Sequence, residues 1–437
     1  MHDMMIISLA IFAITYFFIA TEKVDKAIAA LLGAAAAIAF RTAPYEELLH
    51  KIDMNVIFLL IGMMLIVTIM SSTGVFEYLA ILIARKAKGN GLLIVGAMLL
   101  LTAVLSALLD NVTTVILIAP ITILIAQILE IPAMPILALE AVFSNIGGTS
   151  TLVGDPPNII IGSKAGLSFN AFILNLGPPV FILMVLMLAM TVIIMRKKFT
   201  ASESTIARIM RAQPKLAIVE PKMLKRSLVV FTLVIIGFVV SHSIEIEPGV
   251  IALAGGFTMA LVCKVDIHKT IEKVEWTTIL FFIGLFMLIG ALEHNHVFEK
   301  LGEHILHWTS GNLFLTALII LWAGAFMSAI VDNIPLVIAM IPLIKSISPV
   351  FAVKLGLTGA AAAAQIDQPL FWALALGACL GGNGTLIGAS ANVVIAQIAR
   401  RNNYALSFVE FLKYGFPAMI LSLIVSSVYI WLAYFWK

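Results

Sequence analysis

The sequence predicts an all-α polytopic membrane protein that is built from two inverted-topology repeats. Of its 437 residues, 62% are hydrophobic and only 12% are charged, whereas soluble proteins carry about 25% charged residues. The apolar residues form runs that recur in the same order in both halves of the chain. Two polar, glycine-rich stretches interrupt these runs at matching places, which is typical of secondary transporters.

The apolar runs define the expected helices, because about 20 apolar residues span the hydrocarbon core of a bilayer. Several runs are too short to span alone, which predicts half-helices. In the first half the runs cover about 4–20, 25–40, 54–72, 92–109, 112–129, 133–145, 158–163 and 171–195. In the second half they cover about 226–242, 248–263, 276–292, 312–331, 333–348, 369–380, 391–399 and 411–436.

The repeat also holds at individual residues, with an offset of 222 positions that grows to 234 in the later part of each unit. Lys51, Gly62, Asp110 and Pro120 recur as Lys273, Gly284, Asp332 and Pro342. The domains expected are therefore a first repeat at 1–195, a basic linker at 196–225 and a second repeat at 226–437.

Charged residues at matching points of the two units indicate opposite orientations. The segment RKAKGN at 85–90 is basic, whereas its counterpart HWTSGN at 307–312 contains no Lys or Arg. Short basic loops stay on the cytoplasmic side of a membrane. The 196–225 linker is therefore expected in the cytoplasm, and the chain is expected in the inner (plasma) membrane as a multi-pass protein.

The first polar stretch, SNIGGTSTLVGDPPN at 144–158, cannot continue a helix throughout. Gly147 and Gly148 permit non-helical dihedrals, and Pro156 and Pro157 remove two backbone donors and push Asp155 out of the α region. Such backbone survives at membrane depth only inside protein or beside a water-filled cavity. The sequence therefore predicts a re-entrant helical hairpin followed by a broken helix. The second unit repeats this pattern as CLGGNGTLIGASANVV at 379–394.

Each unit also carries an Asp-Asn pair inside a long apolar stretch. The pairs are Asp110-Asn111 in LLDNVTT and Asp332-Asn333 in IVDNIP. An ionisable group at membrane depth costs about 2.5–3.5 kcal/mol on insertion scales and is a functional hypothesis by default. The alternative is a helix cap at a membrane-surface turn. Two copies at the same distance from a matching proline favour the functional interpretation, with H⁺ or Na⁺ as the coupling ion.

The two units differ in their acidic residues. In the repeat alignment, Asp155 corresponds to Ala389 and Glu140 corresponds to Leu374. Either acid could carry a coupling proton. Asp155 could instead cap the helix that begins at Pro156, and Glu140 could be a satisfied core carboxyl. Cys379, opposite Asn145, is expected to be a packing residue.

Several function classes are excluded. A net charge of +3 gives no reason to expect a nucleic-acid partner. The sequence contains no HExxH, GxSxG or Walker-type motif, so neither enzymatic chemistry nor ATP hydrolysis is expected of this chain. No paired Cys or carboxylate ligand pattern accompanies the histidines, so no metal site is expected. No cofactor is expected besides the coupling ion.

The two polar stretches and the two Asp-Asn motifs resemble those of the ArsB/NhaD permease family of the ion transporter superfamily, and most closely its P-protein-like branch. The similarity extends from about residue 20 to 436. The resemblance implies a scaffold plus a transport domain. It implies that substrate is bound by Asn145, Gly147, Gly148, Thr149, Ser150, Thr151, Asn158, Asn383, Gly384, Thr385, Ser390 and Asn392. It also implies ion coupling by Asp110, Asn111, Asp332, Asn333 and Asp155.

The same resemblance suggests the substrate. A small inorganic ion or metalloid is expected, with arsenite or antimonite efflux coupled to a proton gradient first, because a hydroxyl- and amide-lined pocket suits an uncharged trihydroxy acid. A Na⁺/H⁺ antiporter is the close alternative, followed by a citrate or dicarboxylate carrier and by a passive channel subunit of an ATPase-driven arsenite pump. The expected partners are the lipid bilayer, a second copy in a homodimer and, for the pump, a soluble ATPase.

Overall fold

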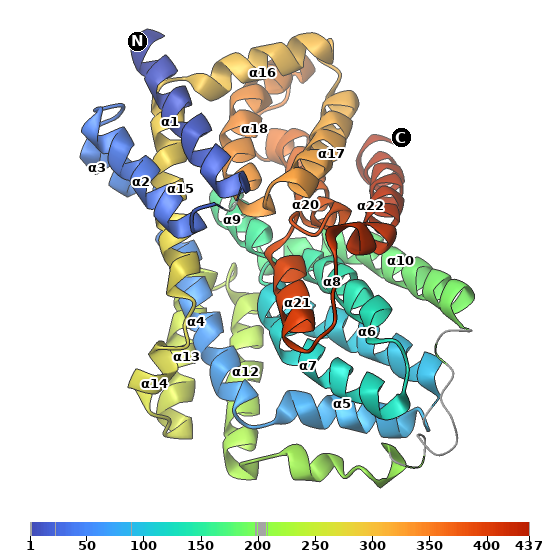
Figure 1. The fold of residues 1–437 in the computed structure, drawn as a ribbon. Coiled ribbons are helices and arrows are strands. Elements are labelled where there is room, and N and C mark those ends of the chain that lie inside the picture. The colour runs from blue at the N-terminus through green and yellow to red at the C-terminus, as the bar shows by residue number, and fades with distance from the viewer. Residues whose placement is uncertain are drawn as a thin grey trace.

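The computed structural model describes residues 2–21, 23–88, 90–196, 199, 207 and 209–436. This part of the chain is an assembly of α-helices (Figure 1). Ten of the described helices are long and apolar enough to cross a membrane. The all-helical polytopic fold that the apolar runs predict is therefore confirmed.

The first repeat contains ten helices. They are α1 (His2–Thr21), α2 (Lys26–Ala39), α3 (Tyr45–His50), α4 (Met54–Ser71), α5 (Val75–Lys86), α6 (Gly91–Leu108), α7 (Asn111–Leu129), α8 (Ala133–Thr149), α9 (Pro156–Ala165) and α10 (Phe169–Met195). Eight of these helices match the predicted runs, including the break between α8 and α9, whereas α3 and α5 lie outside the predicted runs. The 196–225 linker falls partly outside the described residues, which omit 197–198, 200–206 and 208.

The second repeat follows the same order with a few short insertions. The helices described from the linker onward are η1 (Pro214–Ala217), which lies in the predicted linker, and then α12 (Pro221–Val240), α13 (Pro248–Cys263), α14 (Ile267–Ile271), α15 (Trp276–His294), α16 (Val297–Trp308), α17 (Leu313–Ile330), α18 (Asn333–Leu355), α19 (Gly359–Ala362), η2 (Ala363–Asp367), α20 (Gln368–Gly381), η3 (Gly382–Gly384), α21 (Ser390–Arg401), α22 (Phe408–Ile430) and η4 (Trp431–Phe435). The helix α12 already begins at Pro221, inside the predicted linker.

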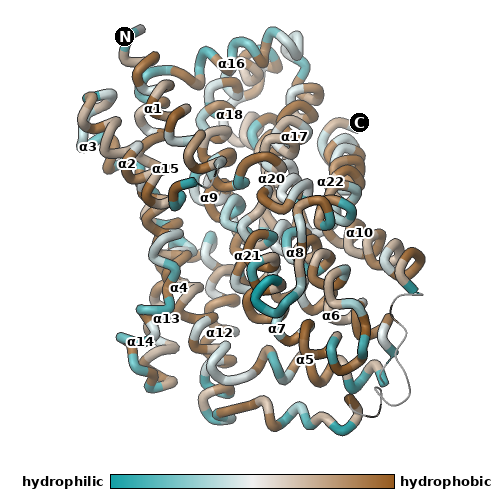
Figure 2. The backbone as a smooth tube through the Cα atoms, in the orientation of Figure 1, coloured by the Kyte–Doolittle hydropathy of each residue, from teal (hydrophilic) through white to brown (hydrophobic). Residues whose placement is uncertain are grey.

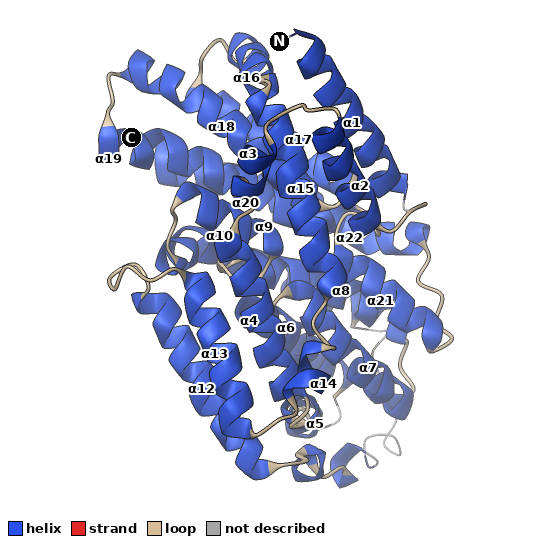
Figure 3. Cartoon of the chain, turned by 90° about the vertical axis from the view of Figure 1, so that its left-hand side faces the viewer, coloured by secondary structure: helices blue, strands red, loops and turns tan. Residues whose placement is uncertain are grey.

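Equivalent helices of the two repeats lie at opposite ends of the molecule. Figures 1 and 3 place α1, α2 and α16 at one end, and α12, α13 and α5 at the other. The helix starts also correspond, because Asn90 and Asn312 cap α6 and α17 while Asp110 and Asp332 cap α7 and α18. Side-chain caps satisfy the backbone N–H groups that a helix start leaves open. The same local chemistry therefore starts each helix in both orientations.

The helices form two groups that match the expected scaffold and transport domain. In the first group α4 packs against α13, and α2 packs against α15. In the second group α8 packs against α6 and α7, and α20 packs against α17 and α18. Figure 2 shows hydrophobic residues along outer helices such as α10, where Leu174 and Ile193 are each 72% exposed. Such a surface suits contact with lipid rather than with water.

The glycines of the first polar stretch do not break a helix, which corrects the expectation for Gly147 and Gly148. Both lie inside α8, which ends at Thr149, and neither has a positive φ. The break comes afterwards, where Asp155 adopts an extended conformation before Pro156. The glycines instead allow close packing, since a Cβ on Gly147 would lie 2.1 Å from the backbone oxygen of Ala103.

Candidate functional site

A cavity of about 200 Å³ lies where helices from both repeats begin. Residues at the N-terminal ends of six helices line it, namely those of α2, α7, α9, α15, α18 and α21. Two of these ends exist because the chain is extended at Leu109 and Val331, which separates α6 from α7 and α17 from α18. A helix N-terminus carries about half a positive charge. The cavity is therefore surrounded by positive dipole ends.

The Asp110-Asn111 pair lies at the cavity wall and has two different functions. The carboxylate of Asp110 caps α7, since it accepts a hydrogen bond of 2.8 Å from the backbone N–H of Thr113 and another from the Thr113 hydroxyl. Asn111 instead points to its neighbours. Its Nδ2 donates to Asn145 Oδ1 at 3.1 Å and to Asp155 Oδ1 at 3.2 Å. The pair therefore combines the cap with a polar contact between α7, α8 and α9.

Asp155 is buried, with 1% of its surface exposed, and it lines the same cavity. It occupies the N-cap position of α9, but its side chain makes no capping hydrogen bond. Pro156 and Pro157 leave the first turn of α9 without two of its usual donors. Within the described part of the chain, no hydrogen bond of ordinary distance and angle forms to Asp155 Oδ2 or Asn111 Oδ1, although the side chains of Cys379 and Asn333 lie beside the Asp155 carboxylate. The capping alternative for Asp155 is therefore wrong, and one buried oxygen of its carboxylate has no hydrogen bond among the described residues.

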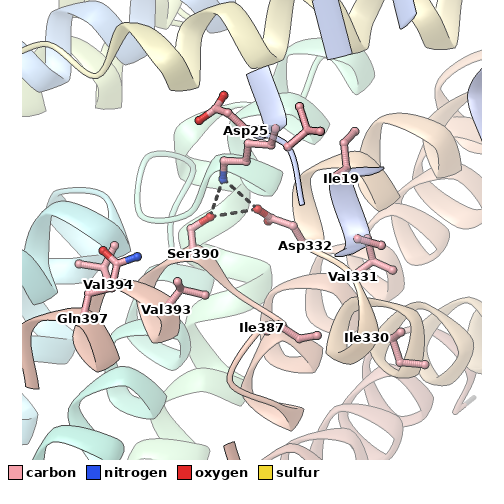
Figure 4. A pocket seen from close by; sticks show the side chains of 13 residues that line it. Ile19, Asp25, Ile330, Val331, Asp332, Ile387, Ser390, Val393, Val394 and Gln397 are labelled. Carbon is pink, nitrogen blue, oxygen red and sulfur yellow. Dashed lines mark hydrogen bonds and ion pairs between the residues drawn. The ribbon is translucent and has the colours of Figure 1, made fainter. Parts of the chain in front are cut away.

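Asp332 has a cationic partner, unlike Asp155. Its Oδ2 lies 3.1 Å from Lys26 Nζ and accepts a hydrogen bond of 3.0 Å from the Ser390 hydroxyl. Lys26 also donates to Ser390 Oγ at 2.9 Å, so the three groups close a triangle (Figure 4). They border a second cavity of about 320 Å³ that shares Lys26, Ser390 and Val394 with the central one. This triangle joins α2 to α18 and α21.

The asparagines of the two polar stretches meet at the centre of the molecule. Asn145 Nδ2 donates to Asn383 Oδ1 at 2.9 Å and to Asn392 Oδ1 at 3.0 Å, which links the two repeats. Asn158 and Asn392 use their own amides to satisfy the turn backbone, donating to Thr151 O at 2.9 Å and Gly382 O at 2.8 Å, respectively. These four asparagines are completely buried. Their amides hold the two turns together and do not line the cavity.

The remaining predicted substrate residues mostly bond to backbone. Thr149 donates to Asn145 O, Ser150 to Gly147 O, Thr151 to Ala107 O, and Thr385 to Ala329 O. Gly384 lies against Met419. Of the predicted substrate-binding residues only Ser390 lines the central cavity, whereas the predicted coupling residues Asp110, Asn111, Asp155 and Asn333 all do. Asp332 lines the adjoining cavity.

Sequence reasoning missed three polar lining residues, which are Lys26, Glu275 and Thr278. All three lie at helix starts of the scaffold group: Lys26 is the first residue of α2, Glu275 is the N-cap residue of α15, and Thr278 lies in the first turn of α15. The gap EKVDK at 22–26 signals a break in the apolar pattern. Lys26 and its partner Asp332 are 306 positions apart in the sequence, so no local pattern could have identified the pairing.

Lys26 and Asp332 are expected to depend on each other for stability. Lys26→Gln leaves the largely buried carboxylate of Asp332 without its partner and Asp332→Asn leaves the half-buried ammonium group of Lys26 without its own, whereas the double variant leaves neither charge. Coupled pairs of this kind show interaction energies of about 0.5–3 kcal/mol. Apparent melting temperatures of the purified parent, both single variants and the double variant measure this coupling. Purely additive shifts would contradict it.

Comparisons with known proteins identify the family of the chain. A family model described as citrate transporter matches residues 16–377. The chain is 41% identical to an uncharacterized transporter of Mycobacterium bovis over 99% of both chains. It is 32% identical to the P protein of Mus musculus over 98% of this chain and 60% of that protein. The fold is similar to that of the YdaH transporter of Alcanivorax borkumensis, with a TM-score of 0.58, 11% identity and coverage of 86% and 85%.

The similarity to P protein confirms the P-protein-like part of the resemblance that the sequence motifs indicated. The family match covers more than half of the chain and reaches from α1 to α20. The helices that form the central cavity therefore lie inside the matched region, apart from α21. The chain belongs to the citrate transporter family and is a multi-span membrane transporter.

Proposed function

We propose that the chain is a secondary active transporter that moves a small oxygen-rich anion, coupled to H⁺ or Na⁺, by alternating access. The observation that supports this most strongly is the cavity at which helix starts from both repeats meet beside Lys26. Broken helices whose N-termini surround a central site are the usual way in which transporters bind anionic groups. The family description as a citrate transporter agrees with an anion.

The cavity has two chemically different sides. The α21 side offers donors, because Ser390 begins a helix with free backbone N–H groups and Lys26 Nζ lies next to it. The α9 side offers acceptors, because prolines remove its first donors and Asp155 Oδ2 and Asn111 Oδ1 have no partner among the described residues. The donor side suits an anion and the acceptor side suits a proton or sodium ion.

The coupling ion is proposed to bind at Asp155, with Asn111 as its neighbour. Burying a carboxylate without a cationic partner is costly, and a bound proton or cation removes that cost. Asp110 is partly satisfied by its helix and Asp332 by Lys26, so Asp155 has the larger need for a cation. Ion binding at Asp155 and anion binding at Ser390 would favour each other across the cavity.

The substrate proposed first is a carboxylate anion. Arsenite or antimonite, the first expectation from the ArsB/NhaD resemblance, is the second candidate. The open acceptors Asp155 Oδ2 and Asn111 Oδ1 support it, because the three hydroxyls of arsenous acid are donors. Na⁺/H⁺ antiport at the same acceptors is the third candidate. A passive channel with a soluble ATPase is the fourth, and a homodimer in the plasma membrane with a cytoplasmic 196–225 linker is the proposed setting.

Uptake into proteoliposomes tests these candidates directly. Radiolabelled citrate, succinate, arsenite and sodium, each with and without a pH or Na⁺ gradient, should show saturable, gradient-dependent uptake of a carboxylate. Gradient-driven arsenite or sodium movement without carboxylate uptake would replace the first candidate with the second or third. Unsaturable flux without gradient dependence would instead indicate a channel and overturn the coupled mechanism.

A further inference from the structure

A separate cavity of about 230 Å³ lies farther along three of the helices that form the central site. The helices α9, α15 and α18 contribute their N-terminal residues to the central cavity and their later residues to this one. A ten-residue helix such as α9 is about 15 Å long. Because α15 leads into α16 (Figure 1), this second space lies toward the α16 end of the molecule.

Three lysines line this cavity, and we name it the basic cavity. They are Lys51, before α4, Lys164, at the end of α9, and Lys345, in the middle of α18. Lys51 pairs with Glu293 at 2.9 Å and Lys164 pairs with Asp53 at 3.4 Å. Within the described residues no hydrogen bond or ion pair involves Lys345. The acidic residues in its surroundings are Glu293 and Asp367.

The inverted repeat supplies an internal comparison for this cavity. Another cavity, of about 250 Å³, is lined by the repeat-equivalent residues. Met64, Val67, Ser71, Ile116 and Lys273 in that cavity correspond to Phe286, Ile289, Glu293, Ile338 and Lys51 in the basic cavity. We name it the neutral cavity, because its charged lining residues are only Lys273 and Glu275. Where the basic cavity has Lys345, the repeat alignment has the uncharged Ile123.

The two cavities stand in different relations to the central site. The neutral cavity adjoins it, since Met64 and Glu275 line both. The basic cavity shares none of the lining residues of the central one. In a transporter built from inverted repeats, the opposite access state exchanges the environments of equivalent elements. The basic cavity is therefore positioned to open onto the central site when the neutral cavity closes.

We propose that the basic cavity binds the transported anion as a vestibule on the α16 side, with Lys345 as the unpaired cation that holds it. The proposal rests on the proposed function, because it assigns the same anion a second, outer site. Three lysines line the cavity, and because Lys51 and Lys164 are paired with Glu293 and Asp53, Lys345 supplies the uncompensated positive charge that attracts an anion into this partly enclosed space. Its volume suits a small anion, because pockets for drug-sized ligands reach about 300–1,000 Å³.

Cysteine labelling at the repeat-equivalent positions tests the vestibule without requiring transport. Ile338→Cys places a thiol in the basic cavity and Ile116→Cys places one in the neutral cavity. Each variant is treated with an anionic and a cationic thiosulfonate reagent of similar size. The parent chain, with its two buried cysteines, gives the background. The ratio of the anionic rate to the cationic rate cancels differences in exposure between the two sites.

The anionic-to-cationic ratio is expected to be about tenfold higher at position 338 than at 116, as a potential of a few kT predicts. Lys345→Gln in the Ile338→Cys chain should lower it several-fold, and millimolar citrate should slow the anionic reaction. Lys354→Gln is the control, since Lys354 is on the same helix but bonds to Ser310 O and Gly311 O. Equal ratios at the two positions, or no effect of Lys345→Gln, would overturn the proposal. If the labelling shows charge selectivity at position 338 but the proteoliposomes take up no anion, the proposed function is overturned while the anion-attracting cavity stands.

Discussion

Replacing Asp155 with asparagine is expected to weaken the coupling ion's binding roughly 10- to 100-fold while the fold persists. A contact with a charged group contributes about 1.5–3 kcal/mol, and each 1.4 kcal/mol is a factor of ten in affinity. Asparagine has nearly the same shape as aspartate, so the contact with Asn111 can be kept. Its side chain has one uncharged carboxamide oxygen in place of a carboxylate. It can therefore neither take up the coupling proton nor attract a cation by its charge.

The measurement is uptake of the transported anion into proteoliposomes as a function of external pH and Na⁺ concentration. Asp155→Asn should require a much higher ion concentration, or lose the dependence on the gradient. Asp155→Glu should keep the charge and recover part of the activity. Circular dichroism and gel filtration should show that both variants are folded like the parent.

Glu140→Gln is the matched control. Glu140 is also a completely buried carboxylate: its Oε1 accepts a hydrogen bond from the Thr122 hydroxyl between α8 and α7, and its Oε2, like Asp155 Oδ2, has no hydrogen bond among the described residues. It lies outside the lining of the central cavity, so its replacement should leave ion dependence unchanged. Parent-like ion dependence in Asp155→Asn would contradict the proposed coupling function, and a loss in Glu140→Gln would transfer it to the alternative acid.

The sequence predicted the helices well because membrane helices are governed by local rules. Apolar runs define the spans, and the same capping residues begin the equivalent helices of both repeats. The break before Pro156 was also predictable, since proline restricts the residue before it. What a local pattern could not provide was whether Gly147 served a bend or a close contact, because both explain a glycine equally well.

The candidate site was predicted less well than the helices, because contacts between distant segments determine it. The Asp-Asn motifs identified the cavity wall, but the partners that separate Asp332 from Asp155 come from distant segments. Lys26 and Asp332 approach each other only because the fold brings the start of α2 close to the starts of α18 and α21. The amides of Asn145 and Asn158 belonged to the predicted substrate set, yet Asn145 bonds to the turn of the other repeat and Asn158 bonds to the backbone of its own turn. Residue type therefore identified the polar centre, while packing decided which groups face the cavity.

Gly147→Ala is expected to destabilise the transport group strongly. An added Cβ would lie 2.1 Å from Ala103 O and 2.6 Å from Ala103 Cα, both in the backbone of α6. Backbone atoms cannot rotate away as a side chain can, so α8 and α6 would have to separate. Overpacking of this kind costs about 1–3 kcal/mol and occasionally more. Small residues at such crossings allow membrane helices to approach closely.

The second repeat makes the same contact, which sharpens the experiment. Gly381 in α20 is the equivalent of Gly147, and a Cβ there would lie 2.4 Å from Ala325 Cα in α17. Each alanine variant should lower the apparent melting temperature in detergent, and the double variant should give little monodisperse protein. Gly324→Ala is the control, because no atom lies within 4 Å of its added Cβ. It should stabilise α17 by up to about 1 kcal/mol through helix propensity. An unchanged melting temperature of Gly147→Ala would contradict the close contact between α8 and α6. The glycine would then be explained by a need for movement between these helices.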